Sequence, residues 1–221
     1  MRLVHALHEP AGDGPHPTVV ALHGWGANAL DLLGLAPHFD AGRFLVLCPQ
    51  GLVEVPIGPG ALGYGWFPLS VGRPPAREAF EDAHAALDAF LLEAERRYPI
   101  APARTALLGF SQGGVMAYAL ALRKPKRFAA VAALSTWLVA DLVTRPGETP
   151  ALDGLPVLVQ HGSADPLIAV DRGRTAVPLL RDWNAEVVYR EYDMGHEISA
   201  ASLRDLDEFL RAKLVSRPGP S

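Results

Sequence analysis

One serine of the chain lies in a pattern that could make it a nucleophile. Ser111 is the centre of Gly109-Phe110-Ser111-Gln112-Gly113, which matches the G-x-S-x-G signature of a nucleophile elbow. The residues before it form a short apolar run typical of a buried strand, and the apolar residues after it recur at helical spacing. The residue frequencies of the chain predict roughly 0.07 chance matches to this signature. We therefore predict that Ser111 lies on a tight strand-to-helix turn.

A serine hydroxyl is a weak nucleophile until a base accepts its proton. With this signature the partners are expected in the order Ser, acid, His, and only His161 and His196 follow Ser111. His161 comes directly after an apolar strand-like run and should be held at a strand end. His196 lies in a predicted loop and can reach over the serine. We therefore expect His196 to be the base.

The acid that orients the histidine is expected to be Asp165, although Asp193 is nearer to His196 in the chain. The acid must approach the imidazole nitrogen that faces away from Ser111, which requires the loop of a different strand. Asp165 alone could be an ordinary turn starter, because it precedes Pro166. In the expected order, however, Ser111, Asp165 and His196 are better explained as a catalytic triad.

Acyl transfer also needs N–H donors for the oxyanion. The amide of Gln112 is a candidate because it follows the nucleophile at a helix N-terminus. The second candidate is the amide of Trp25, in the loop after the early strand that ends at His23-Gly24. His23 itself is expected to be structural, since it precedes the serine.

The composition of the chain argues against a nucleic-acid-binding protein and against binding to an anionic membrane. The chain has 221 residues, of which 49% are hydrophobic and 20% charged, and its formal net charge is −4. No basic stripe suggests nucleic acid and no polybasic segment suggests an anionic membrane. The single cysteine, Cys48, cannot form an internal disulfide and is expected to pack in the core. No metal or cofactor is predicted.

The termini and apolar runs suggest a cytoplasmic protein without stable membrane insertion. The N-terminal residues lack the apolar core of a signal peptide, because His5, His8 and Glu9 interrupt it. The longest nearly apolar stretch, "AAVAALSTWLVA", is too short to cross a bilayer. The tail, residues 216–221, is expected to be frayed.

Strand-like and helix-like segments alternate along the chain, which predicts a single α/β domain over residues 1–221 with a mostly parallel sheet and helices on both faces. Strands are expected within residues 18–24, 43–51, 105–111, 128–135, 155–162 and 186–196. Helices are expected around residues 29–38, over 78–98 and after Ser199 as N-cap. Residues 51–75 and 136–154 look irregular, and the second stretch is too short to build a cap domain.

Several motifs together resemble the carboxylesterase and acyl-protein thioesterase group of α/β-hydrolases, also labelled phospholipase/carboxylesterase. The motifs are "ALHGWGAN", "GFSQGG", "LSTWL", "HGSADPLI" and "MGHEIS", and the resemblance runs from about residue 17 to 212. It implies an α/β-hydrolase fold and a serine esterase acting on small-molecule esters through the same triad and amides. It also suggests that Trp66, Trp137 and Leu138 line the acyl pocket, and "GYGWFPL" resembles the Trp-Phe loop near that pocket, which includes Phe67.

Two departures from the family pattern concern the substrate. Pro68 replaces an acidic residue that often follows Trp-Phe in the thioesterases, and Trp25 is bulkier than the usual leucine. We expect short-to-medium acyl esters to be cleaved. The alternatives are acyl-protein thioesterase or lysophospholipase activity, and a non-catalytic α/β-hydrolase scaffold used for binding.

Overall fold

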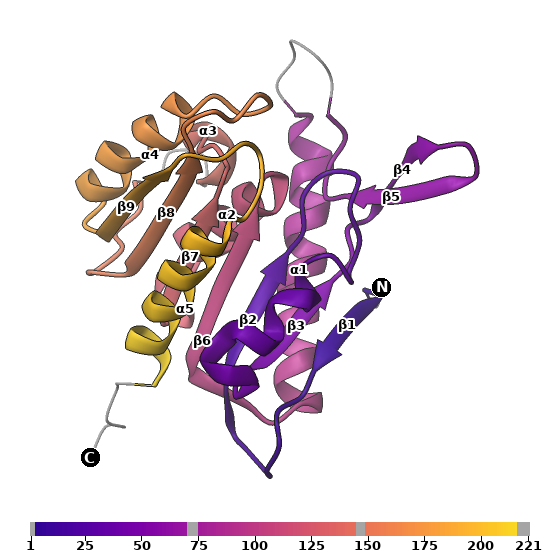
Figure 1. Cartoon of the computed structure of the whole chain (residues 1–221), viewed down its shortest axis with the longest axis vertical. Helices are drawn as coiled ribbons and strands as arrows, with labels where there is room; N and C mark the ends of the chain where they lie inside the picture. The colour runs from indigo at the N-terminus through magenta and orange to yellow at the C-terminus, as the bar shows by residue number, and fades with distance from the viewer. Residues whose placement is uncertain (1–2, 70–74, 145–148, 216–221) are drawn as a thin grey trace.

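A seven-stranded sheet forms the centre of the computed structural model, which describes residues 3–69, 75–144 and 149–215 (Figure 1). The strands lie in the order β1-β3-β2-β6-β7-β8-β9, and β1 alone among these seven pairs antiparallel to its neighbour. They are β1 (His5–His8), β2 (His16–Leu22), β3 (Leu45–Pro49), β6 (Ile100–Phe110), β7 (Ala130–Leu134), β8 (Pro156–Gly162) and β9 (Glu186–Tyr192).

The central strands are buried because helices cover both faces of the sheet. Strands β3, β7 and β8 are buried along their whole length, as their near-continuous apolar sequences predict. One face packs against α1 (Arg77–Arg97), α2 (Gln112–Arg123) and α4 (Asp171–Asp182), and the other against α5 (Ala200–Leu214) and the 3-10 helix η1 (Leu32–Gly42). The predicted mostly parallel sheet between helices is confirmed.

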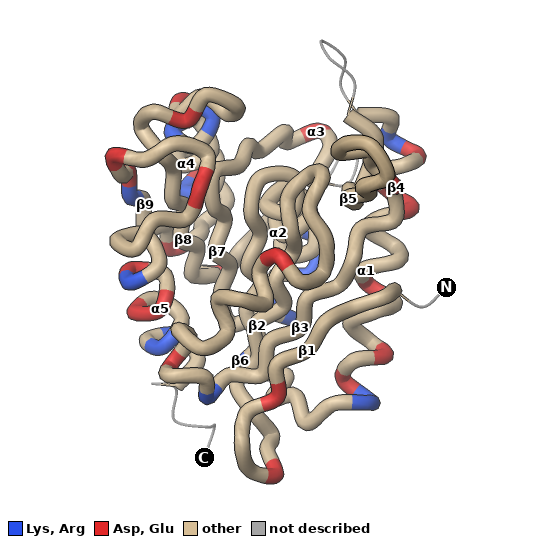
Figure 2. Tube along the Cα trace, turned by 45° about the vertical axis from the view of Figure 1, so that its right-hand side comes forward, with Lys and Arg blue, Asp and Glu red and all other residues tan. Residues whose placement is uncertain are grey.

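The two long outer helices follow their sequence patterns closely. Helix α1 buries the apolar face predicted for residues 78–98, and its charged residues lie outside. Helix α5 begins after Ser199, whose hydroxyl accepts a hydrogen bond from the amide of Ser202, so the predicted N-cap is present. Acidic and basic residues are mixed along α4 and α5 (Figure 2). No helix in the described part of the chain is both long and apolar enough to cross a bilayer.

Two segments differ from expectation. Within the stretch expected to be irregular, residues 51–75, strands β4 (Val53–Gly58) and β5 (Ala61–Gly65) form a two-stranded hairpin that projects from the body (Figure 1). Gly58, Pro59 and Gly60 form the tip of the hairpin, whereas Pro56, Gly63 and Gly65 lie within its strands. The helix expected around residues 29–38 is instead η1, a 3-10 segment with Pro37 inside it. Proline removes a backbone donor, which disfavours a regular α-helix through Pro37. The segment is also kinked at Phe39, Asp40 and Ala41, whose φ and ψ are not helical.

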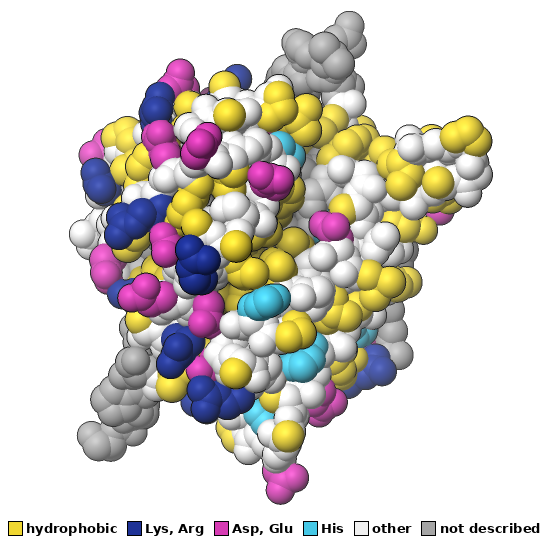
Figure 3. Space-filling model, viewed as in Figure 1, with side chains coloured by type: hydrophobic (Ala, Val, Ile, Leu, Met, Phe, Trp, Pro, Cys, Tyr) yellow, Lys and Arg dark blue, Asp and Glu magenta, His cyan; other side chains and the backbone are white. Residues whose placement is uncertain are grey.

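Smaller differences lie at the edges of the fold. The sequence reasoning missed β1, a four-residue edge strand, and in the stretch 136–154 the structure has a short helix α3 (Ala140–Val143). The tail 216–221, expected to be frayed, lies outside the described residues. Cys48 packs in the core as expected, and burial raises the pKa of its thiol to about 12. Charged side chains gather near α4, β9 and α5, whereas the hairpin carries mostly hydrophobic ones (Figure 3).

Candidate active site

The strand order changes direction between β2 and β6, because the chain moves outward from β2 to β3 and then returns to the other side of β2. In open α/β sheets ligands bind beyond the carboxyl ends of the strands at such a point. The loop after β2 carries Trp25, and the turn after β6 carries Ser111. The sheet therefore brings both predicted elements to one edge.

Ser111 occupies the predicted turn between β6 and α2 in a backbone conformation that is unusual for a residue with a side chain. Its φ is 53° and its ψ is −120°. The turn is tight because α2 rests directly on the strands: a Cβ on Gly113 would lie 2.0 Å from the carbonyl oxygen of Leu22, and one on Gly109 would lie 2.4 Å from that of Gly113. Both motif positions therefore require glycine.

A threonine that the sequence reasoning did not single out holds this turn. The hydroxyl of Thr136 donates to the carbonyl oxygen of Ser111 at 2.6 Å, and the amide of Ser111 donates to the carbonyl of Leu134 at 2.9 Å. Strained backbone of this kind costs about 1–3 kcal/mol and persists only where its surroundings enforce it. The sole signal in the sequence is that a hydroxyl residue follows the strand next to the elbow.

Asp165 and His196 meet across two loops. Nδ1 of His196 donates to Oδ2 of Asp165 at 2.7 Å, and the aspartate side chain is fully buried. The other carboxylate oxygen accepts the amides of Leu167 at 2.9 Å and Ile168 at 2.8 Å. Burial acts to raise the pKa of Asp165, but the amide of Ile168, the His196 ring and the amide of Leu167 outweigh it and hold that pKa below its usual value. Asp165 is therefore a carboxylate at neutral pH.

Asp193 and His161, the alternative acid and base, have different surroundings from Asp165 and His196. Asp193 is exposed, and it makes no hydrogen bond or ion pair within the described residues. His161 is fully buried near the end of β8, where its Nε2 lies 2.8 Å from the carbonyl oxygen of Ile168 and 3.5 Å from Oδ2 of Asp165. It therefore supports the loop of the aspartate.

His196 lies beside the elbow. Its ring stacks at a tilt on the ring of Phe110, with 4.8 Å between the centroids, and Phe110 immediately precedes the serine. The Ser111 hydroxyl has no hydrogen-bond partner among the described residues. Catalytic hydrogen bonds are often long in an unliganded enzyme and shorten when substrate binds. We therefore expect the hydrogen bond between Ser111 and His196 to form when substrate binds.

Trp25 and Gln112, the candidate oxyanion donors, belong to segments next to the serine. A Cβ on Gly24, next to Trp25, would lie 3.3 Å from Cβ of Ser111, so the loop after β2 packs directly on the nucleophile. Gln112 is the first residue of α2, where no intrahelical carbonyl is available to its amide. The Trp25 amide likewise has no acceptor among the described residues. Both N–H groups are therefore without an acceptor among the described residues.

Two residues expected in the acyl pocket lie in the core instead. The side chains of Trp66 and Phe67 are 1% and 0% exposed, and neither lines the cleft beside Trp137. The two residues are held by the side chain of Gln112, which accepts from the Trp66 amide at 2.8 Å and donates to the Phe67 carbonyl at 2.7 Å. Because both side chains are buried, neither is included in the acyl groove proposed below.

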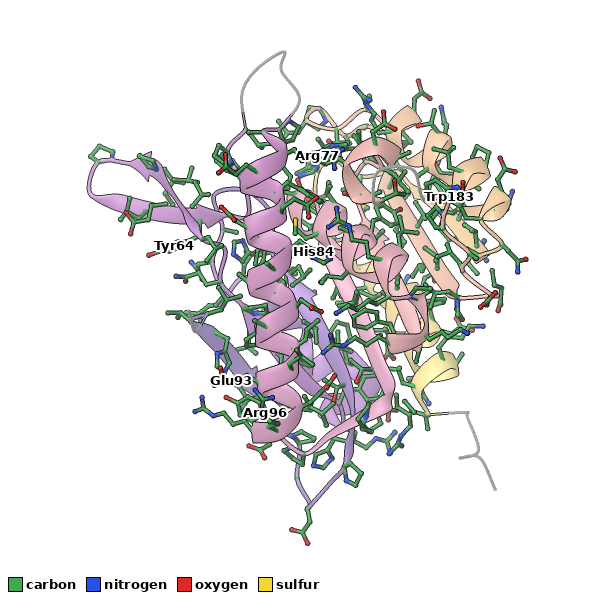
Figure 4. The ribbon with its side chains drawn as sticks, turned by 180° about the vertical axis from the view of Figure 1, so that it is seen from behind. Tyr64, Arg77, His84, Glu93, Arg96 and Trp183 are labelled. Atoms are coloured by element: carbon green, nitrogen blue, oxygen red, sulfur yellow. The ribbon has the colours of Figure 1, made fainter. Side chains whose placement is uncertain are left out.

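A cleft of about 760 Å³ lies beside the candidate triad. Trp137, one of the expected pocket residues, lines it, whereas Leu138 is partly buried against the core. The cleft reaches neither Ser111 nor His196, but it begins next to them: Trp137 follows Thr136, and Leu167 and Ile168 bind Asp165. Its lining is mainly apolar, namely Leu69, Pro75, Trp137, Val139, Leu142, Leu167, Ile168 and Ala169, with Arg77, Asp141 and Arg172 as the charged members. Figure 4 locates Arg77 near the start of α1.

Nothing in the geometry suggests a metal centre. Within residues 3–69, 75–144 and 149–215, no three His, Cys, Asp or Glu side chains are grouped so that they could hold an ion. The groups of the candidate site are a hydroxyl, an imidazole, a carboxylate and two backbone amides.

Several known proteins are similar to this chain in sequence and in fold. The sequence profile of the Phospholipase/Carboxylesterase family matches residues 5–214. Acyl-protein thioesterase 1 of Gibberella zeae is 29% identical over 93% of this chain and 94% of its own length. The crystal structure of esterase PE8 is 32% identical, covers 97% of this chain and 100% of that one, and has a TM-score of 0.81. A Bacillus cereus carboxylesterase, 24% identical over 96% of this chain and 94% of that one, shares the fold with a TM-score of 0.80.

Proposed function

We propose that Ser111, His196 and Asp165 form the catalytic triad of this chain. The chain belongs to the phospholipase/carboxylesterase family of α/β-hydrolases and is a serine hydrolase of carboxylic esters. The observation that carries the assignment is the 2.7 Å hydrogen bond from His196 to the buried Asp165. It lies beside a strained Ser111 with two unpaired amides around it. A scaffold used only for binding would need none of these features.

The mechanism follows from the groups present. Ser111 attacks the ester carbonyl while His196 accepts its proton, and the proton then passes to the departing alcohol. Asp165 keeps the proton on Nδ1, so that Nε2 of His196 is free to act as the base. The amides of Trp25 and Gln112 donate to the oxyanion of each tetrahedral intermediate. Water then hydrolyses the acyl-enzyme by the same route.

The cleft lined by Trp137, Leu167 and Ile168 is the proposed acyl groove. Each methylene that leaves water contributes about 0.8 kcal/mol, nearly fourfold in affinity, but only while the acyl chain stays inside the groove. The stretch after β7 contributes no large cap in its described part, where α3 has only four residues. An open groove of this kind favours short-to-medium acyl chains.

Thioester hydrolysis is the second candidate, because an aligned relative carries the name acyl-protein thioesterase 1. The chemistry at Ser111 would be the same. A lysophospholipase would in addition need contact with an aggregated lipid. The oxygen-ester and thioester reactions are separated by comparing octanoyl esters with octanoyl thioesters that carry the same leaving-group chain.

We expect hydrolysis of p-nitrophenyl esters to peak between butyrate and octanoate and to fall for palmitate, without a lag at lipid interfaces. The measurement is kcat/KM for each acyl length. Leu167→Ala, in the cleft, should reduce the advantage of octanoate over acetate about threefold or more. Leu92→Ala is the matched control, because Leu92 is also an exposed leucine but lies on α1 outside the cleft. A steady rise of kcat/KM to palmitate would contradict an open groove.

A further inference from the structure

The end of strand β5 and the residues after it run between the two candidate oxyanion donors. We call residues 64–67 the brace. On one side, Tyr64 is hydrogen-bonded to the loop after β2: its amide donates to the carbonyl of Ala27 at 2.7 Å, and its carbonyl accepts the amide of Gly26 at 2.9 Å. Figure 4 shows Tyr64 where the hairpin meets the body. One end of the brace is therefore attached to the loop that carries Trp25.

The other end of the brace is attached to the nucleophile helix. The side-chain amide of Gln112 accepts the amide of Trp66 and donates to the carbonyl of Phe67, so that both of its polar atoms are used. Between these ends there is no spare room. A Cβ on Gly65 would lie 2.2 Å from the ring of Trp25 and 3.1 Å from Oε1 of Gln112. The brace thus touches both donor residues at once.

A third link crosses directly to the loop after β2. The indole Nε1 of Trp66 donates to the carbonyl oxygen of His23 at 2.9 Å, and the two rings are stacked at a tilt with centroids 5.1 Å apart. His23 is itself held, since its Nε2 accepts the amide of Gly51 at 3.0 Å and its Nδ1 donates to the carbonyl of Gly24 at 2.7 Å. Burial lowers the pKa of His23 and outweighs the opposing effect of the Gly24 carbonyl. The lowered pKa keeps the ring neutral, so that Nε2 can accept the bond from Gly51.

We propose that Trp66 is a positioning residue, which holds the Trp25 amide and the Gln112 amide at the separation that the oxyanion requires. This inference rests on the proposed function. Trp66 donates one hydrogen bond toward each donor residue. Its backbone amide donates to the side chain of Gln112, and its indole donates to the carbonyl of His23, in the loop that carries Trp25. Both bonds are buried, where an N–H left without an acceptor is costly, so the arrangement resists displacement. This role differs from the substrate contact that the family resemblance suggested for Trp66.

The test compares variants that break the brace with one that only loses core packing. Trp66→Phe keeps an aromatic ring but removes the bond to His23, and Gln112→Met keeps the amide donor of residue 112 but removes both bonds to the brace. Phe44→Leu is the control. Phe44 is fully buried on the sheet face covered by η1 and α5, and it has no polar side-chain atom. For each, kcat and KM are measured on p-nitrophenyl butyrate, and kcat is divided by the number of sites that a fluorophosphonate labels to completion.

We expect kcat per labelled site to fall about tenfold or more in Trp66→Phe and in Gln112→Met, with KM within about twofold, because misplaced donors weaken the transition state more than substrate binding. The double variant should lose little more than the worse single one, since both act on one chain of bonds. Phe44→Leu should lower the melting temperature but keep kcat per labelled site.

Three outcomes would overturn the inference. One is an unchanged kcat per labelled site in Trp66→Phe, or in Gln112→Met if the first variant does not fold. Another is a loss in Phe44→Leu as large as in the brace variants, which would mean that general destabilisation explains the effect. The third is labelling of wild type at a residue other than Ser111. This result would refute the proposed function, and the inference with it, whereas the first two leave the proposed function intact.

Discussion

Replacement of Ser111 by alanine should remove at least ~10³ of kcat while the protein stays folded, because triad residues act as a unit and the remaining groups supply only binding and oxyanion stabilisation. The side chain contributes no hydrogen bond to the described structure, so its loss should leave the core unchanged. The measurement is kcat on p-nitrophenyl butyrate, together with the melting temperature of each preparation.

A second serine provides the control for this prediction. Ser163→Ala removes an exposed hydroxyl that donates to the carbonyl of Tyr192. That variant should keep wild-type turnover. Equal activity of Ser111→Ala and wild type, in a preparation free of contaminating esterase, would be incompatible with a serine mechanism at this site.

Replacement of Asp165 by asparagine should lower kcat by about 10⁴, as loss of tautomer control does in other triads. An asparagine amide can donate to Nδ1 of His196, which moves the ring proton to Nε2 and removes the base. Because the Asp165 pKa is held low, the wild-type side chain is ionised at the assay pH, and acidification through that low pKa would remove the same support. The measurement is kcat for Asp165→Asn beside Asp193→Asn.

The second aspartate variant makes this prediction specific. Asp193 is exposed and unpaired within the described residues, so Asp193→Asn should change kcat less than about twofold. If Asp193→Asn were the more damaging change, the acid would have been assigned to the wrong residue.

Much of the fold could be predicted because it is encoded in local patterns. The turn that carries Ser111 depends on a change of apolar period and on two glycines that allow close packing, and both features are visible in the chain. The buried face of α1 and the N-cap at Ser199 are likewise properties of neighbouring residues. The order of Ser111, Asp165 and His196 also could be taken from the sequence. Their roles in catalysis, the single domain and the cytoplasmic location stay predictions.

The features that were missed depend on contacts between distant segments. Trp66 was expected to line the acyl pocket because its motif resembles the Trp-Phe loop of the family, but its side chain is buried and its indole donates to the carbonyl of His23. The hairpin had a signal, since the alternation of Val53, Val55 and Ile57 leads into a Gly-Pro-Gly turn. The contact of Thr136 with Ser111 had almost none, because its position depends on the register of β7 against β6.

Covalent labelling of the native protein tests the central claim most directly. A fluorophosphonate reacts with a serine only where a base and an oxyanion site activate it, so the label identifies the nucleophile without any substitution. The labelled protein is digested, and the modified residue is located by peptide mass spectrometry while residual esterase activity is followed. We predict one label per chain, on Ser111, with activity lost in proportion to labelling. Full activity in the presence of a labelled Ser111, or loss of activity with the label on another residue, would contradict the account.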